Sequence, residues 1–287
     1  MLSRLMVLAA ALLFSTGGAA IKATTLNGWQ TAGLRSLVAA IALTALVPQA
    51  RRGWSWRVWP LGLVYALTLV SFVHATKLTT SANAIFLQST APAYLLLIGP
   101  VFLKEKVARR DLIFTAALVG GMILLFTGAA NPLATAPDPA RGNLYALFSG
   151  AAYAVTLAGL RHRAESSALA TVVCGNILAF AISMPAALPI LSFTRVDGAV
   201  LLYLGFLQIG LAYWLLTHGM KHVTAFEAST LLLLEPVGNP IFTWLIHGEN
   251  PGQRTLAGGA VILVSTFVKL WFDRSQSLQA HLREPVA

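Results

Sequence analysis

Long apolar stretches separated by short polar segments run through this chain from end to end. A helix needs about 20 mainly apolar residues to cross the hydrocarbon core of a bilayer. Counting stretches of that length between breaks of charge, Pro or Gly predicts ten transmembrane helices. The predicted ranges are 5–21, 29–48, 58–76, 80–103, 112–129, 143–160, 168–190, 198–218, 223–246 and 255–272.

The composition supports a membrane protein. Hydrophobic residues make up 57% of the chain and charged residues 10%, whereas a soluble domain has about a quarter of its residues charged. The net charge of +10 does not indicate nucleic-acid binding, because the basic residues are scattered among the predicted loops and not gathered on one face. We therefore expect an all-α integral membrane protein of the multi-pass type.

The distribution of Lys and Arg predicts the orientation. Basic residues are retained on the cytoplasmic side, and alternate loops carry most of them, as in Arg51-Arg52 and Arg109-Arg110. Both termini are then cytoplasmic, in a bacterial inner membrane. The first apolar stretch could pass for a signal peptide, but removing it would leave nine helices and break the repeat described next.

A Pro-rich segment divides the predicted helices five and five. The predicted units are a first repeat over 1–130, a periplasmic linker over 131–142, a second repeat over 143–273 and a cytoplasmic tail over 274–287. An odd number of helices in each half inserts the second half upside down. The sequence thus predicts two inverted five-helix repeats, an arrangement found in many secondary transporters.

The fourth and ninth predicted helices share an unusual register. Aligning Pro92 with Pro236 also aligns Glu105 with Glu249. A proline within a membrane helix and a glutamate just past its end are both uncommon, so their common spacing supports the repeat.

These residues carry a resemblance to a known family. The chain resembles the drug/metabolite transporter superfamily, in its ten-helix branch with two EamA domains, through the following motifs: Leu34-Arg-Ser-Leu37, Ala91-Pro92, Leu103-Lys-Glu105, Leu234-Glu-Pro236 and His247-Gly-Glu249. Within that branch it is most similar to the YddG-type exporters. The resemblance implies export of aromatic amino acids and related compounds.

Prolines and glycines break the fourth and ninth predicted helices. A proline removes one backbone hydrogen bond and crowds the carbonyl four residues before it. We expect these breaks to act as hinges that open a central cavity alternately to each side, although a fixed kink would have the same sequence. The hinge candidates are Pro92, Gly99, Pro100, Pro236, Gly238 and Pro240.

Polar and aromatic residues near the centres of the predicted helices are candidates for the walls of that cavity. Buried polar groups in membrane helices often mark a solute pathway, but each could instead make an interhelical hydrogen bond or pack in the core. The candidates are Gln88, Tyr94, Tyr153, Asn176, Gln208, Tyr213, Trp214, Trp244 and Asn239.

Four ionisable residues are candidates for proton transfer or gating. Glu235, near a helix centre, could carry a proton, or it could stay protonated and bond a carbonyl freed by Pro236, which we favour. Arg35, His74 and Glu227 lie toward helix ends and are gate candidates.

No motif in the sequence indicates an enzyme, a metal site or another cofactor. The predicted function is export of hydrophobic or aromatic amino acids and related metabolites, with a small-molecule substrate and the lipid bilayer as partners. Two alternatives stay open: a proton-coupled carrier of organic cations, and a membrane scaffold or intramembrane enzyme. The oligomeric state, monomer or homodimer, also stays open.

Overall fold

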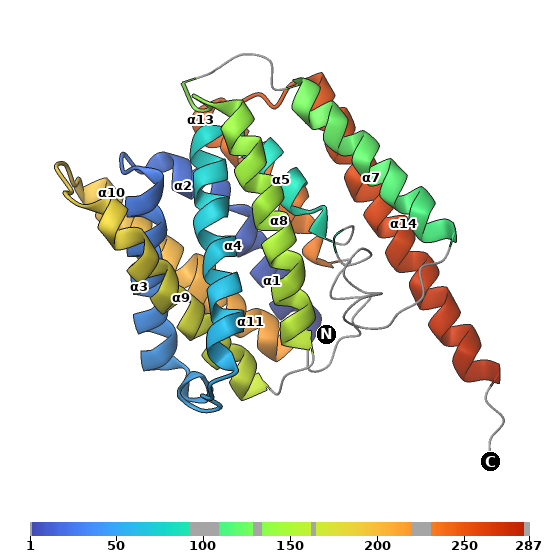
Figure 1. Ribbon diagram of the computed structural model, residues 1–287, viewed down its shortest axis with the longest axis horizontal. Helices are drawn as coiled ribbons and strands as arrows, with labels where there is room; N and C mark the ends of the chain where they lie inside the picture. The colour runs from blue at the N-terminus through green and yellow to red at the C-terminus, as the bar shows by residue number, and fades with distance from the viewer. Residues whose placement is uncertain are drawn as a thin grey trace.

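A computed structural model describes residues 2–91, 94, 109–128, 134–161, 165–219 and 231–283, and every element in these residues is a helix (Figure 1). The helices are α1 (Leu2–Ser15), α2 (Gly17–Ala23), α3 (Gly28–Leu46), η1 (Pro48–Arg51), α4 (Val58–Leu78), α5 (Ser81–Gln88), α7 (Arg109–Gly128), α8 (Pro139–Arg161), α9 (Glu165–Ala187), α10 (Arg195–Leu202), η2 (Tyr203–Leu211), α11 (Ala212–Gly219), α13 (Leu234–His247) and α14 (Gln253–Arg283).

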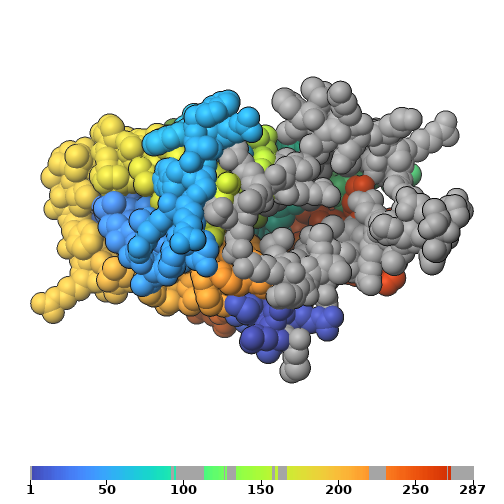
Figure 2. Space-filling view, turned by 90° about the horizontal axis from the view of Figure 1, so that it is seen from below, coloured from blue at the N-terminus to red at the C-terminus, as the bar shows by residue number. Residues whose placement is uncertain are grey.

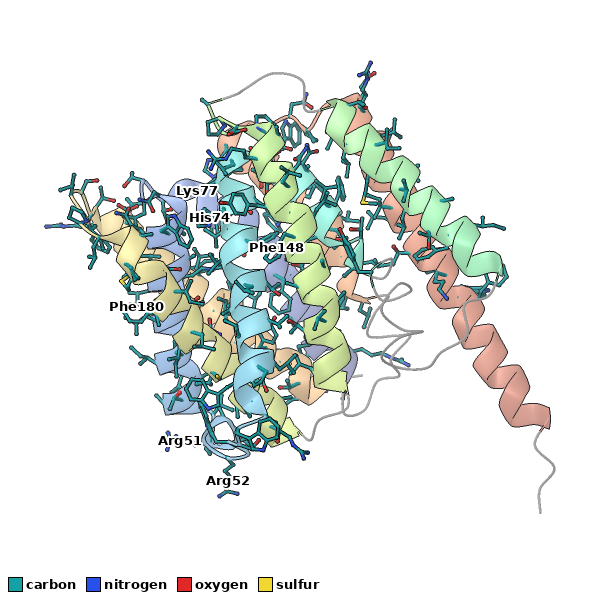
Figure 3. The ribbon with its side chains drawn as sticks, in the orientation of Figure 1. Arg51, Arg52, His74, Lys77, Phe148 and Phe180 are labelled. Carbon is teal, nitrogen blue, oxygen red and sulfur yellow. The ribbon has the colours of Figure 1, made fainter. Side chains whose placement is uncertain are left out.

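The all-helical, membrane-type fold expected from the sequence is confirmed for the described residues. Four stretches there are long and apolar enough to cross a membrane by length and composition: Leu2–Ala23, Val58–Leu78, Ser167–Ala187 and Arg195–Gly219. The total of ten helices and the cytoplasmic location of the termini stay predictions. We use the predicted topology only to name directions: the end that carries Arg51 and Arg52 is the inner end, and the opposite end is the outer end (Figure 3).

Several helices begin at the outer end with side-chain caps. Asn27 and Gln30 form a reciprocal capping box at the start of α3, and Thr194 and Asp197 form another at the start of α10. Thr80 accepts a bond from the Asn83 amide at the start of α5. These caps satisfy amides that the first turn of a helix leaves without partners, so the chain can turn sharply between helices.

Contacts between helices of the two halves occur in pairs that the predicted repeat relates to each other. α4 packs on α8 and α1 packs on α11, while α5 packs on α8 and α1 packs on α13. In the predicted repeat, α1 is equivalent to α8, α4 to α11 and α5 to α13. The contact of α4 with α8 therefore corresponds to that of α11 with α1, and the contact of α5 with α8 corresponds to that of α13 with α1. The contact pattern is therefore the one expected if the halves share a fold.

A separate antiparallel pair, α7 and α14, lies beside the main bundle (Figure 1). Its two helices can approach closely because Gly121 and Gly258 carry no Cβ. A Cβ on Gly121 would lie 2.8 Å from a side-chain carbon of Ile262, and one on Gly258 would lie 2.7 Å from the Gly121 carbonyl, and both distances are too short. Gly259 likewise faces the ring of Phe86, which connects the pair to α5. Small residues thus set this packing, as expected for helices in lipid.

The first turns of α1 and the last turns of α14 lie toward the inner end (Figure 1). Figure 2 looks onto this end, where the connection between α3 and α4 crosses the surface and the start of α1 lies at the edge.

Candidate functional site

Side chains from six helices form a cluster of polar and aromatic groups, which we call the central cluster. It consists of Arg35 (α3), Tyr65 (α4), Tyr153 (α8), Asn176 (α9), Tyr213 (α11) and Glu235 (α13). Glu235, expected near a helix centre, lies instead in the first turn of α13. The rings of Tyr65 and Tyr213 meet edge to face with their centroids 5.9 Å apart. Tyr213 interacts electrostatically with both Arg35 and Glu235, and Tyr153 interacts with Tyr213 and Glu235. Both halves of the chain therefore contribute to one site.

Arg35 is the buried cation of the central cluster, with only 2% of its surface exposed. Its Nη2 donates one long hydrogen bond, 3.4 Å, to the carbonyl of Leu69, and its Nε has no partner. Its electrostatic neighbours are the hydroxyls of Tyr65 and Tyr213, which carry no formal charge. A guanidinium has five N–H donors, so Arg35 keeps unused donor capacity inside the protein.

Two further polar atoms of the central cluster lack partners. The Tyr65 hydroxyl lies close to Tyr213 and Asn176 but makes no hydrogen bond of ordinary geometry. Asn176 donates through Nδ2 to the carbonyl of Val172, 2.9 Å away in its own helix, which leaves its Oδ1 free. Buried polar groups are normally satisfied, so an unused donor and an unused acceptor side by side indicate a place for a ligand or water.

Tyr153, Tyr213 and Glu235 are partly buried, and each keeps part of its surface accessible. Within the described part of the chain, the Glu235 carboxyl makes no hydrogen bond or ion pair. The carboxyl therefore has no partner among these residues that would compete with a solute or a proton.

The backbone of η2 is irregular next to the central cluster. Residues Tyr203–Leu211 form a π-helix, a form that occurs mostly as short insertions and frequently at functional sites. Gly205 has no Cβ and so allows η2 to approach α3. A Cβ there would lie only 2.7 Å from the Arg35 carbonyl. Gln208 faces Gly17 on the other side, with its Oε1 lacking a partner.

A buried ion pair links several helices at the outer end. Lys22, in α2, lies 2.8 Å from the Glu249 carboxylate after α13, and the two side chains are 4% and 2% exposed. Glu249 also accepts a 2.6 Å bond from the Ser81 amide at the start of α5. Lys22 donates to the carbonyls of Thr79, at 2.9 Å, and Thr135. The pair thus joins the first, fourth and ninth predicted transmembrane segments.

Other polar contacts reinforce these links. Lys77 donates to the carbonyl and hydroxyl of Thr24, at 2.7 and 2.9 Å. The fully buried Asp197 accepts from the amide and hydroxyl of Thr25, at 2.7 and 2.8 Å. Figure 3 shows Lys77 and His74 together toward this end of α4, away from Arg51 and Arg52. We call these contacts, with the Lys22–Glu249 pair, the outer network.

The remaining predicted gate residue within the described chain, His74, packs between aromatic rings. Its ring centroid lies 4.4 Å from that of Trp29 and 5.3 Å from that of Tyr145, and its Nδ1 lies 2.9 Å from the Val70 carbonyl. It belongs to the outer half of α4 and not to the central cluster.

Several predicted cavity residues lie apart from the central cluster. Gln88 donates to the Ser149 hydroxyl at 2.8 Å and so joins α5 to α8. Asn239 is fully buried and bonds Ser81 beneath the outer network. Trp244 is 55% exposed on α13.

Two more aromatic candidates lie near the surface of the bundle. Trp214 stacks on His218 and lines a groove of about 260 Å³ between α3 and η2. Tyr94 is partly buried, near Thr90.

Turns lie a few residues before two of the predicted hinge prolines, and the hinges themselves stay predictions. α5 ends at Gln88 and is followed by a turn, and a matching turn at Leu233 precedes α13. Pro236, Gly238 and Pro240 all lie within α13. Pro92, Gly99, Pro100 and Glu227 lie outside the described residues.

The described residues contain no group of three or more His, Cys, Asp or Glu that could hold a metal ion. Tyr65 is the member of the central cluster that sequence reasoning missed, although a tyrosine in the middle of an apolar stretch was a usable signal. The Lys22–Glu249 pair was also missed, because its members are far apart in the sequence and follow different helices.

Comparison with known proteins identifies a family that matches most of the chain. A model described as the EamA-like transporter family matches residues 1–127 and 140–271. The pseudopaline exporter CntI of Pseudomonas aeruginosa is 25% identical over 276 residues, covering 91% of this chain and 93% of that protein. The riboflavin transporter ImpX of Fusobacterium nucleatum is 25% identical over 228 residues, covering 73% of this chain and 71% of that one. A solved crystal structure shares the fold with a TM-score of 0.65 and 18% identity, covering 96% of this chain and 98% of the other.

Proposed function

This chain belongs to the EamA-like transporter family, and we propose that it is a secondary transporter that exports hydrophobic or aromatic amino acids and related metabolites. The observation that carries the proposal is the central cluster. It combines tyrosine rings with unpartnered polar atoms, and both halves of the chain contribute to it. The rings suit an apolar or aromatic side chain, and the polar atoms suit the groups that the solute would otherwise keep hydrated.

The related proteins do not decide the substrate. One is named for pseudopaline and another for riboflavin, so the family carries solutes of different chemistry. Specificity must come from the residues that line the site in each member. The tyrosines of the central cluster are the reason we favour aromatic and hydrophobic amino acids for this chain.

Alternating access is the proposed mechanism. The outer network closes one end above the central cluster, as expected for a state that receives its solute from the cytoplasm. The breaks at the end of α5 and at Leu233 are at equivalent positions of the two proposed repeats, and they support paired hinges at Pro92 and Pro236. The pairs of helix contacts that the predicted repeat relates support the inverted relation of the halves.

A proton-coupled carrier of organic cations is the second candidate, because the Glu235 carboxyl is unpaired within the described residues. The buried Arg35 guanidinium weighs against it, since a fixed positive charge in the same cluster repels a cationic solute.

The test is flux in proteoliposomes of the intact protein. Labelled phenylalanine, tryptophan, threonine and methyl viologen are compared, with and without a pH gradient, for the unaltered protein and Glu235→Gln. Amino-acid flux that persists in the variant and without the gradient supports facilitated amino-acid export. Viologen flux that disappears with Glu235→Gln would move the chain to the cation carriers. No flux of any solute would favour a scaffold.

A further inference from the structure

Arg35 is a buried cation with few partners in the described residues. A cation that is 98% buried requires compensation, because taking a guanidinium out of water is costly unless it is paired and hydrogen-bonded. The structure provides one hydrogen bond at 3.4 Å and no ion pair to Arg35 within the described chain. The compensation present is therefore small for this charge.

The groups around Arg35 are neutral donors and acceptors. Tyr65 and Tyr213 are its electrostatic neighbours. Glu235 interacts with Tyr213 and Tyr153, and within the described residues it forms no ion pair with Arg35. The charge of Arg35 is therefore not neutralised by the one acid of the central cluster, and Tyr153 and Tyr213 beside that acid are only partly buried.

The unpartnered atoms in this region have complementary chemistry. Arg35 Nε and the Tyr65 hydroxyl are donors, whereas Asn176 Oδ1, held outward by the bond from Nδ2 to Val172, is an acceptor. A carboxylate offers only acceptors, and an amino group next to it offers only donors. An α-amino acid would satisfy all three atoms at once.

We propose that Arg35 binds the carboxylate of the transported solute, with the Tyr65 hydroxyl as a second donor and Asn176 Oδ1 as the acceptor for a neighbouring amino group. This rests on the proposed function, in that the central cluster is the solute site. It adds a substrate class: small organic carboxylates, and amino acids foremost among them. A solute that lacks an anionic group leaves the charge of Arg35 without a partner and should bind more weakly.

The first experiment uses the unaltered protein in lipid nanodiscs and varies only the probe. Binding is followed as a rise in melting temperature with increasing concentrations of L-phenylalanine, L-phenylalaninamide, phenethylamine and 3-phenylpropionate, with succinate and nicotinate as unrelated carboxylates. The amide and the amine lack a carboxylate and should bind about 10- to 100-fold more weakly than phenylalanine, the range for losing a hydrogen bond to a charged group. 3-Phenylpropionate lacks only the amino group, so its affinity should fall less than that of the amide and the amine.

The second experiment varies the protein. Arg35→Gln should weaken phenylalanine binding by the same factor and bring phenylalanine and its amide to similar affinity. Arg35→Lys keeps the charge but not the planar fork, so it should retain the preference for carboxylates with reduced affinity. Tyr65→Phe should give a smaller loss. Arg141→Gln, at a side chain that is 70% exposed, is the matched control and should leave binding unchanged.

The outcomes separate this inference from the proposed function. If phenylalaninamide or phenethylamine binds as tightly as phenylalanine, Arg35 does not bind a carboxylate, although transport of aromatic compounds stands. If succinate or nicotinate binds and phenylalanine does not, the carboxylate role stands and the aromatic amino acids are excluded. A variant of Arg35 that fails to fold leaves the comparison of probes on the unaltered protein decisive.

Discussion

The Lys22–Glu249 pair predicts that a single conservative substitution will open the outer end. Glu249→Gln keeps an oxygen to accept the Ser81 amide but leaves the Lys22 ammonium buried without a counter-charge. Removing one partner of a buried ion pair costs about 3–5 kcal/mol. Lys22 keeps its bonds to two backbone carbonyls, so we take the lower figure. When the outer end opens, water hydrates the charge and the cost disappears, so the equilibrium should shift toward the open state by roughly 100-fold.

The assay is labelling by a membrane-impermeant maleimide applied from outside. Cys174, the single cysteine, is buried and is first replaced by Ser. A reporter is then introduced as Ser15→Cys, at a fully buried position that contacts Leu234 at the start of α13. The labelling rate of Ser15→Cys should rise strongly when Glu249→Gln is added.

The matched controls test the charge itself. Combining Lys22→Met with Glu249→Gln removes both charges and should return the labelling rate toward that of the reporter alone. Asp138→Asn, at a half-exposed carboxylate on the same end, should have no effect. If Glu249→Gln leaves the rate unchanged, or if the double variant labels as fast as the single one, the ion pair does not hold the outer end closed.

Three further predictions follow from local geometry. Pro236→Ala restores a backbone donor at the helix break, so flux should fall severalfold while solute binding, measured in nanodiscs, is retained; equal losses of both would contradict a hinge. Gly121→Ala should lower the melting temperature by overpacking worth about 1–3 kcal/mol, whereas Gly120→Ala, one position away with nothing within 4 Å of its Cβ, should not. Asp197→Asn should destabilise the fold by about 2–4 kcal/mol because several donors lose a charged acceptor, with Asp138→Asn as the neutral control in the same thermal assay.

The sequence predicted the helices because lipid imposes a length and an apolar composition that can be counted along one dimension. It also predicted that the fourth and ninth helices would be interrupted, since a proline removes a backbone bond wherever its side chain points. The turns after Gln88 and at Leu233 begin three residues before Pro92 and Pro236, whereas Pro236, Gly238 and Pro240 themselves lie within α13.

The grouping of side chains could not be predicted in the same way. These helices are apolar on most faces, so the pattern does not fix their rotation about their axes. Arg35 was a gate candidate and Glu235 a possible proton carrier or a partner of a freed carbonyl, whereas the structure places both beside Tyr213. Gln88 and Trp244 were expected in the cavity, but one bonds a neighbouring helix and the other lies exposed. No local feature of the sequence distinguishes the residues of the central cluster from those that lie outside it.

The Lys22–Glu249 pair also bears on how the chain is inserted during synthesis. One charge comes from each half. Under the predicted topology the two charges meet only if the second half enters the membrane upside down relative to the first. A chain whose second half inserted the other way would hold these charges on opposite faces, about 30 Å of hydrocarbon apart. Each would then be buried alone or drawn to the wrong interface. Under that topology, the ion pair forms only in chains whose two halves have opposite orientations.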